Sequence, residues 1–437
     1  MYLRRIERAN PKLHAYVAVY AESARAAADG ADRQRAAGLP RGPLHGLPIA
    51  IKDLCDIDGK VGTVGSKAWA ARRGTTTAAV VERLLSAGMI ILGKLHMVEF
   101  AFGGWGTNPL CGTPWNPWDL NLHRVPGGSS SGSGVAVAAG LAPAAIGSDT
   151  GGSVRIPAAF NGIVGLKTTF GLISLYGSFP LSTTLDTIGP LTRTVADAGL
   201  LTAALAGADP RDPGTQHAPG FEYSTRANAR GARVALLPEH QFPGPVDAAV
   251  LMGYREAAAV LRRLGAHVEE RDFPFDLEAL TQRNGQLIAA EAYSIHRTYI
   301  EDSQVAIGQY VRARIMAGKT VSAADYIAAR QHQRESQQRF LAWMEGSDAL
   351  LMPGVPMAAI PMSEVDEQKT PATFTRTGNY LGGCALGLPA GHSSAGLPVG
   401  VQLLAKPFAE TTILAIGAAF EAETGYARKS PDLRSLL

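Results

Sequence analysis

The sequence of 437 residues has little cysteine, and its histidines form no recognisable metal-binding pattern. The three cysteines, Cys55, Cys111 and Cys384, include no C-x-x-C pair, which argues against a disulfide framework and against the usual zinc sites. None of the ten histidines belongs to an H-x-x-x-H or H-E-x-x-H pattern, so we expect no metal and no other cofactor. The expected environment of such a chain is a reducing cytoplasm.

Long apolar runs and an excess of one charge are also absent. No apolar stretch reaches about 18 residues without a polar interruption, which argues against a membrane span. The 41 basic and 38 acidic residues give a net charge of only +3 and form no long basic run. Direct binding of nucleic acid is therefore not expected. The charged N-terminus lacks the apolar core of a signal peptide. A small molecule is the expected partner.

Hydrophobic residues, which make up 46% of the chain, alternate with glycine-rich turns in a pattern typical of α/β proteins. Residues 77–87 have helical periodicity, Gly88 ends the helix, and residues 89–92 are predicted to form the next strand. Residues 1–29 carry apolar side chains at helical spacing and are expected to form helix. Further strands are expected at 47–51, 233–237, 349–352 and 396–404, with an amphipathic helix at 246–264.

The domain organisation predicted from the sequence is one domain over residues 1–437. No internal stretch has the composition of a linker, and no repeat or low-complexity segment is present. Chemistry-bearing motifs concentrate in residues 43–200. Residues 275–345 are polar, charged and helical in pattern, without strand signals. We expect these helices to cover one side of the core and to shape a substrate pocket.

Two glycine-lined serine turns are the most informative feature of the chain. GGSSSGSG at 127–134 and DTGGSVR at 149–155 place Ser129 and Ser153 24 residues apart. Glycine lets the backbone approach a substrate and point several N–H groups at one position. Nucleophilic catalysis needs a hydroxyl beside such donors. Lys52 follows an apolar run, and burial there would lower its pKa enough for it to act as a base. The pattern favours a hydrolase.

Each of these features also has a structural interpretation. Lys52 can pair with Asp53, and a serine-rich turn can be a helix N-cap or a plain link between strand and helix. Ser130 also fits the G-x-S-x-G elbow of α/β-hydrolase esterases, although residues 119–127 do not look like the strand that this elbow requires. A dinucleotide-binding fingerprint fails because Val137 stands where its last glycine would be.

The chain resembles the amidase signature family. The resemblance spans nearly the whole chain and is densest over residues 43–200. It implies a single α/β domain in which helices cover both faces of a mixed, twisted β-sheet. The matching segments, besides the two serine turns, are LPIAIKD (47–53), GK (93–94), EFAFG (99–103), Asn108, NPW (116–118), GIVGLK (162–167), LDTIGPLTRT (185–194) and GLPVGVQ (396–402).

The resemblance further implies an amide-cleaving enzyme with a Ser-cisSer-Lys triad. Ser153 corresponds to the nucleophile, Ser129 to the bridging serine in a cis peptide, and Lys52 to the base. The N–H groups of the oxyanion hole would come from Thr150, Gly151, Gly152 and Ser153. Asp149 and Arg155, on either side of the second turn, are expected to support it by pairing or hydrogen bonding. The acyl-enzyme would form on Ser153 and be hydrolysed by water.

The chain departs from the family pattern at three places, of which one is Leu54, where the family commonly has Asn. Residues 165–172 read GLKTTFGL where the family usually has G-L-K-P-T-x-G-R, so the geometry of the loop after the triad is not implied. The N-terminus begins late within the usual first helix, and one interpretation is a truncated chain with a weakened dimer contact. A homodimer is left open.

The expected substrate is a small carboxamide, with an aryl amide or a carbamate as variants. Candidate pocket residues are Trp105, which would favour an apolar or aromatic group, Phe179, and Arg376, which would meet a carboxylate or bind backbone carbonyls. Three other functions stay open. The chain could be the A subunit of a glutamine-dependent tRNA amidotransferase, which needs a partner. It could also be a non-catalytic binding protein, or an esterase that uses Ser130.

Overall fold

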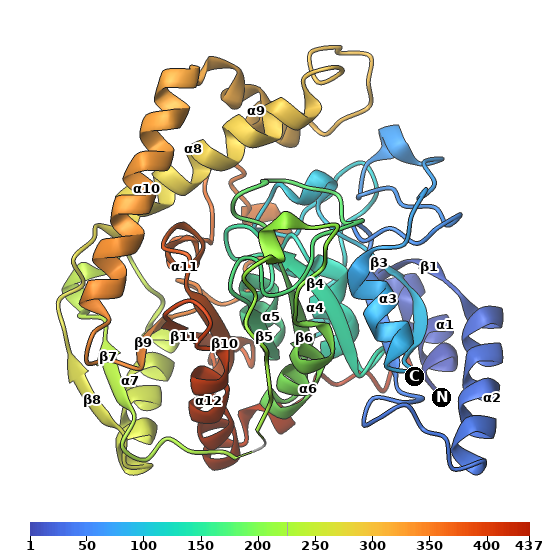
Figure 1. The fold of residues 1–437 in the computed structure, drawn as a ribbon, viewed down its shortest axis with the longest axis horizontal. Helices are drawn as coiled ribbons and strands as arrows, with labels where there is room; N and C mark the ends of the chain where they lie inside the picture. The colour runs from blue at the N-terminus through green and yellow to red at the C-terminus, as the bar shows by residue number, and fades with distance from the viewer. Residues whose placement is uncertain (225) are drawn as a thin grey trace.

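The computed structural model of the chain describes residues 1–224 and 226–437, and its strands join in one mixed sheet (Figure 1). Along the sheet the strands follow the order β1 (Tyr16–Val19), β3 (Ile90–Leu95), β2 (Pro48–Lys52), β4 (Ala144–Asp149), β6 (Thr187–Thr192), β5 (Val164–Lys167), β10 (Cys384–His392), β11 (Pro398–Ala405), β9 (Ala349–Pro353), β7 (Arg233–Leu236) and β8 (His267–Glu270).

The strand that matters most for the site is β2, which pairs in parallel with both β3 and β4. The register places Ala50 opposite Ala145 and Ile51 opposite Ile146. Because the carboxyl ends of parallel neighbours lie at the same edge of a sheet, Lys52 and Asp149 come together there. Every residue of β4 is buried, as is each residue of β2 except Pro48, so this edge is set deep in the protein.

Helices cover both faces of the sheet. On one face α4 and α5 contact strands β4, β5, β10 and β11, and on the other α6, α7 and α12 contact β6, β10 and β11. Side chains alternate accordingly along β4: Ala145 packs with the α4 side chains, whereas Ile146 packs in the cluster that holds α3 residues. The helices are α1 (Tyr2–Leu13), α2 (Ala21–Ala36), α3 (Ala79–Ser86), α4 (Ser131–Ala138), α5 (Arg155–Asn161), α6 (Val195–Leu205), α7 (Ala248–Arg263), α8 (Leu277–His296), α9 (Gln309–Met316), α10 (Ala323–Trp343), α11 (Arg376–Tyr380) and α12 (Glu410–Thr424).

Helices α8, α9 and α10 form a separate group at the upper left of Figure 1. Local sequence explains where two of them begin. Asp276 accepts hydrogen bonds from the first N–H groups of α8. Ser322 and Asp325 form a reciprocal capping box at the start of α10. Helix α8 also packs on α11, and this contact closes the space above the serine turns.

The predicted α/β fold with a mixed sheet and helices on both faces is confirmed, but the helix expected over residues 1–29 is wrong. The chain leaves α1 at His14, whose φ is 51°, and forms strand β1 before α2 begins. Asn10 fixes this change by accepting from the Tyr16 N–H and donating to the Tyr16 carbonyl. The apolar spacing that suggested helix instead puts Tyr16 inside and leaves Val17 exposed. In the described residues no helix is both long and apolar enough to cross a bilayer.

Candidate active site

Lys52 is the last residue of β2 and is completely buried. Its Nζ makes hydrogen bonds of 2.8 Å to Ser129 Oγ and of 2.8 Å to Ser148 Oγ. Burial lowers the pKa of Lys52 to about 7, although nearby Cys55, Asp186 and Asp149 act to raise it. A large part of the lysine population is therefore neutral near pH 7, and a neutral amine can accept a proton from Ser129.

The neighbouring Asp53 does not pair with Lys52. Its Oδ1 lies 3.4 Å from Nζ of Lys94, and its Oδ2 accepts hydrogen bonds from the N–H and Oγ1 of Thr63 at 2.9 and 2.6 Å. Lys94 also donates to the carbonyl of Cys55. Because Asp53 has these other partners, the Lys52 Nζ has only the hydroxyls of Ser129 and Ser148 as hydrogen-bond partners among the described residues, and burial remains the largest influence on its pKa.

The first serine turn contains a cis peptide between Gly128 and Ser129. Gly128 has no room for a side chain, because a Cβ there would lie 2.8 Å from the Gly103 carbonyl oxygen. The next residue, Ser130, is completely buried just before α4, and its Oγ lies 3.3 Å from both the carbonyl oxygen and the N–H nitrogen of Ser148. Ser130 therefore serves to join the turn to β4, and it is not presented to a substrate as an elbow nucleophile would be.

The second serine turn leaves β4 and leads into α5. Ser153 is 8% exposed and lines a cavity together with Thr150 and Gly151. Gly152 has a φ of 127°, and a Cβ there would lie 2.1 Å from Thr375 Oγ1, so only glycine fits. The Gly152 N–H donates to Asp149 Oδ1 at 2.7 Å. The N–H groups that remain as candidates for an oxyanion hole are therefore those of Thr150, Gly151 and Ser153.

A buried ion pair fixes the shape of this turn. Asp149 and Arg155 are fully buried and lie 2.9 Å apart, and Asp149 also accepts from the Val154 N–H. Burial acts to raise the pKa of Asp149, but Arg155, Lys167 and Asn379 together outweigh it and hold that pKa well below its usual range. Arg155 also donates to the Thr375 carbonyl and to the side chains of Asn379 and Gln402. The pair therefore ties the turn to α11 and β11.

The two serine turns contact each other directly. The Ser130 N–H donates to the carbonyl oxygen of Ser153 at 3.3 Å, and the Val98 N–H donates to that of Ser129 at 3.1 Å. Within the described residues the Lys52–Ser129 hydrogen bond is formed, whereas the hydroxyls of Ser129 and Ser153 are not hydrogen-bonded to each other. Catalytic hydrogen bonds often tighten only when substrate is bound. The structure thus brings the three predicted residues Lys52, Ser129 and Ser153 into neighbouring positions and joins the first two by a hydrogen bond.

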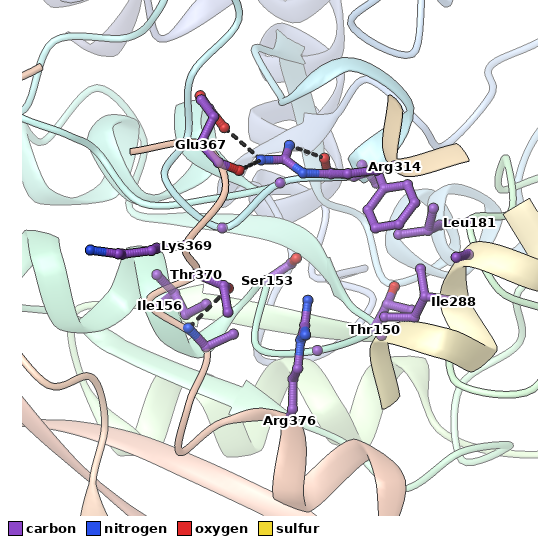
Figure 2. A pocket seen from close by; sticks show the side chains of 18 of the residues that line it. Thr150, Ser153, Ile156, Leu181, Ile288, Arg314, Glu367, Lys369, Thr370 and Arg376 are labelled. Carbon is purple, nitrogen blue, oxygen red and sulfur yellow. Dashed lines mark hydrogen bonds and ion pairs between the residues drawn. The ribbon is translucent and has the colours of Figure 1, made fainter. Parts of the chain in front are cut away.

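The cavity in front of Ser153 has a volume of about 270 Å³ (Figure 2). Its floor is the second serine turn. Its other walls come from residues 101–104, from Leu181, from α8 and α9, from residues 367–370 and from Arg376 at the start of α11. The helices within 275–345 were predicted to shape a pocket. Of these, α8 contributes Gly285, Ile288 and Ala289 to the cavity lining, and α9 contributes Arg314.

Two of the three predicted substrate-binding residues lie outside this cavity's lining. Trp105 is only 4% exposed and packs in an apolar cluster with Ile156 and Phe160. Its indole N–H donates to the carbonyl oxygens of Asp366 and Lys369, so it holds the loop that forms one wall. Phe179 lines a neighbouring cavity of about 240 Å³ instead. Arg376 is the predicted residue that reaches the cavity itself.

Sequence reasoning missed two residues that complete the site. Ser148 is the second partner of Lys52, and nothing in its sequence context distinguishes it from other strand serines. Asp186 accepts hydrogen bonds from Thr150 Oγ1 and from the N–H groups of Leu181 and Ser182. Burial raises the pKa of Asp186 to about 6. Its place in the LDTIGPLTRT segment was the available signal. No group of His, Cys, Asp and Glu suited to a metal ion occurs among the described residues.

Comparison with known proteins finds amidases and amidotransferase A subunits that are similar to this chain. A family model described as Amidase matches residues 1–414. The chain is 36% identical to the A subunit of a glutamyl-tRNA(Gln) amidotransferase from Geobacter metallireducens, over 97% of this chain and 93% of the relative. It is similar to the solved structure of a vestigial protein complex linked to the origins of an s-triazine catabolic enzyme, with a TM-score of 0.89, 31% identity and coverage of 97% and 94%. It is also similar to the peptide amidase of Stenotrophomonas maltophilia, with a TM-score of 0.86, 32% identity and coverage of 99% and 94%.

Proposed function

Because this chain belongs to the amidase signature family, we propose that it cleaves the C–N bond of a carboxamide through an acyl-enzyme on Ser153. The observation that carries this proposal is the buried hydrogen bond between Lys52 Nζ and Ser129 Oγ. It joins a lysine with a pKa of about 7 to a serine turn that contacts Ser153. A base that is partly neutral at neutral pH is what activation of a serine hydroxyl requires.

The proposed reaction follows from these positions. Neutral Lys52 takes the proton of Ser129, and Ser129 takes the proton of Ser153 as the Ser153 oxygen attacks the amide carbon. The N–H groups of Thr150, Gly151 and Ser153 stabilise the negative charge on the carbonyl oxygen. The proton then returns through Ser129 to the leaving nitrogen, the C–N bond breaks, and an ester on Ser153 remains. Water hydrolyses this ester and regenerates the serine.

One finer form of the function is a free-standing hydrolase of a small carboxamide, with aryl amides and carbamates as variants. The similarity to the peptide amidase of Stenotrophomonas maltophilia, over nearly the full length of both chains, supports this form. The volume of the cavity, about 270 Å³, is below the usual range of sites for drug-sized ligands. This volume favours a small acyl group.

The second candidate is the A subunit of a glutamine-dependent tRNA amidotransferase. The names of the curated relatives favour this function, since such A subunits from several bacteria are 36 to 37% identical to this chain over nearly its whole length. In this role the same serine would hydrolyse the side-chain amide of glutamine. The released ammonia would then be used by partner subunits, and any contact with tRNA would come through that assembly.

Ammonia release by the purified chain tests the proposal and separates the two forms. We expect release from simple primary amides by the chain alone, and none from the Ser153→Ala variant. Turnover of simple amides without a partner supports the free-standing hydrolase. Turnover of glutamine that appears only when amidotransferase partner subunits are added supports the second form. Equal ammonia release by the wild type and by Ser153→Ala would contradict both.

A further inference from the structure

Arg376 stands directly over the second serine turn. Its side chain rises from the start of α11 into the cavity, between Ser153 and Thr150 in the view of Figure 2. A Cβ at Gly151 would lie 3.3 Å from Cγ and 3.6 Å from Nε of Arg376. A Cβ at Gly285, on α8, would lie 3.1 Å from its Nη1. Since Gly151 and Gly285 have no side chains, nothing from these two residues lies between the Arg376 guanidinium and the serine turn.

The guanidinium of Arg376 has few partners in the protein. Its side chain donates one hydrogen bond, from Nη1 to the carbonyl oxygen of Thr281 at 3.0 Å, and forms no ion pair within the described residues. Four of its five N–H groups are therefore left for another acceptor. Burial, and to a smaller extent Arg314, lower its pKa to about 10, so the group still carries its charge at neutral pH.

The other charged side chains that line the cavity already have partners. Arg314 and Glu367 form an ion pair of 2.6 Å, and Glu367 also accepts from Thr107. Lys369 is 79% exposed and lies 3.7 Å from Asp366. The lining thus contains three cations and a single carboxylate, and that carboxylate is occupied. Arg376 is the cation for which the described residues supply no acidic partner.

A second polar group beside the same glycine also lacks a partner. Asn284 on α8 is completely buried, and neither atom of its side-chain amide is hydrogen-bonded. Its Oδ1 lies 3.2 Å from the position of a Cβ on Gly151. Buried polar groups in native proteins nearly always have a partner. Two incompletely bonded polar side chains therefore meet at Gly151, next to the nucleophile.

We propose that the substrate is a small amide that carries a carboxylate but no cationic group, and that Arg376 binds this carboxylate. This inference rests on the proposed amide hydrolysis by Ser153 and specifies its substrate class. A planar guanidinium with free N–H groups matches the two oxygens of a carboxylate. An ammonium group on the substrate would enter beside Arg376 and Arg314 without a free carboxylate to receive it. Glutamine, which carries such a group, is then a poor substrate despite its terminal amide.

Three amides that share a five-carbon chain but differ in their charged groups test the proposal. Glutaramate carries a carboxylate and a terminal amide, L-glutamine adds an α-ammonium group to it, and pentanamide lacks both charges. We expect kcat/KM for glutaramate to exceed that for pentanamide and that for glutamine by roughly 10- to 100-fold, the range for a charged hydrogen-bonding pair. Arg376→Gln should remove most of the preference for glutaramate over pentanamide. Lys369→Gln is the matched control and should keep it, since Lys369 is exposed and faces Asp366.

Labelling of Ser153 by a fluorophosphonate keeps the two proposals distinguishable. If Ser153 is labelled but glutaramate and pentanamide are hydrolysed equally well, or glutamine is preferred, the substrate class is wrong while amide hydrolysis stands. If Ser153 is not labelled and no amide is cleaved, the proposed function itself fails. If Ser153 is labelled but none of the three amides is hydrolysed, the test is whether malonate, succinate or glutarate slows the labelling of Ser153. Slower labelling that depends on Arg376 supports the inference, and no protection by any of them overturns it.

Discussion

The two sides of the cavity differ in whether their charged side chains have partners within the protein. On the wall formed by the serine turns, buried charges are paired inside the protein, as in Asp149–Arg155 and Asp53–Lys94, and Lys52 meets only hydroxyls. On the helical wall, Arg376 reaches the cavity with no acidic partner among the described residues. The buried charges beside the serine turns thus have partners within the protein, whereas Arg376 on the opposite wall leaves an interaction open for a ligand. Substitutions on the two walls should therefore have different effects.

The largest effect is expected on the serine-turn wall, from the loss of the nucleophile. Ser153→Ala should lower kcat/KM by about 1,000,000-fold, because formation of the proposed acyl-enzyme requires this oxygen. Ser130→Ala is the matched control, since it removes a buried hydroxyl from the adjacent turn whose hydrogen bonds, within residues 1–224 and 226–437, are to Ser148. It should cost about 1 kcal/mol of stability and less than tenfold in rate. Steady-state kinetics and thermal unfolding of the two variants check this, and the reverse order of rate losses would favour the esterase alternative.

Two buried lysines provide the next contrast. Lys52→Met should lower kcat/KM by roughly 1,000-fold, the middle of the range for a general base, while the free energy of unfolding changes by about 1 kcal/mol or less. Lys94→Met should instead destabilise the protein by about 3–5 kcal/mol, because Asp53 loses its buried partner. Chemical denaturation and kinetics on the same preparations separate the two roles. A large loss of stability in Lys52→Met with little loss of rate would contradict the assignment of Lys52 as the base.

The pH dependence of the wild type should show the base directly. Lys52 has a pKa of about 7 and must be neutral to act, so its active form is lost as the pH falls below that value. We expect kcat/KM to fall about tenfold per pH unit below pH 7 and to level off above it. Asp186, with its pKa raised by burial to about 6, should steepen the fall at lower pH as its bonds to the turn weaken. A profile that is flat from pH 6 to pH 8 would be inconsistent with this mechanism.

The smallest effect is expected where one hydrogen bond only orients the turn. Thr150→Val removes the donor to Asp186 but keeps the backbone N–H of residue 150. We expect kcat to fall by about three- to tenfold and stability to fall by about 1 kcal/mol, the usual worth of one such bond. Measurement of kcat and KM separately would show whether the change affects the reaction or the binding step. A 1,000-fold loss would mean that this side chain takes part in the chemistry.

The sequence was most informative on the serine-turn wall. Lys52, Ser129 and Ser153 lie in short segments whose residue types and spacing resemble the family, and the apolar neighbours of Lys52 correctly predicted its burial. Even there, the partner of Asp53 was not predictable, because Lys94 reaches it from the next strand of the sheet. Asp186 stood out only as part of a motif, since its bonds to the turn depend on how β6 and the preceding loop pack.

On the helical wall the sequence could not separate alternatives. Trp105 in a glycine-rich loop has the same local sequence whether its ring faces a cavity or the core, and the structure places it in the core. For Arg376, both a carboxylate and backbone carbonyls were compatible with the local sequence. The single bond to Thr281 and the approach to Gly151 depend on three segments far apart in the chain. Such a site is defined by tertiary packing rather than by local pattern.

The most direct test of the central claim is the rate at which a fluorophosphonate modifies Ser153 as a function of pH, followed by intact mass and peptide mapping. This measurement needs no knowledge of the substrate. We predict a single adduct on Ser153, a rate that rises through a pKa near 7, and loss of both the rapid labelling and its pH dependence in Lys52→Met. An adduct on Ser130, or equally rapid and equally pH-dependent labelling of Ser153 in Lys52→Met, would contradict the Lys52–Ser129–Ser153 relay.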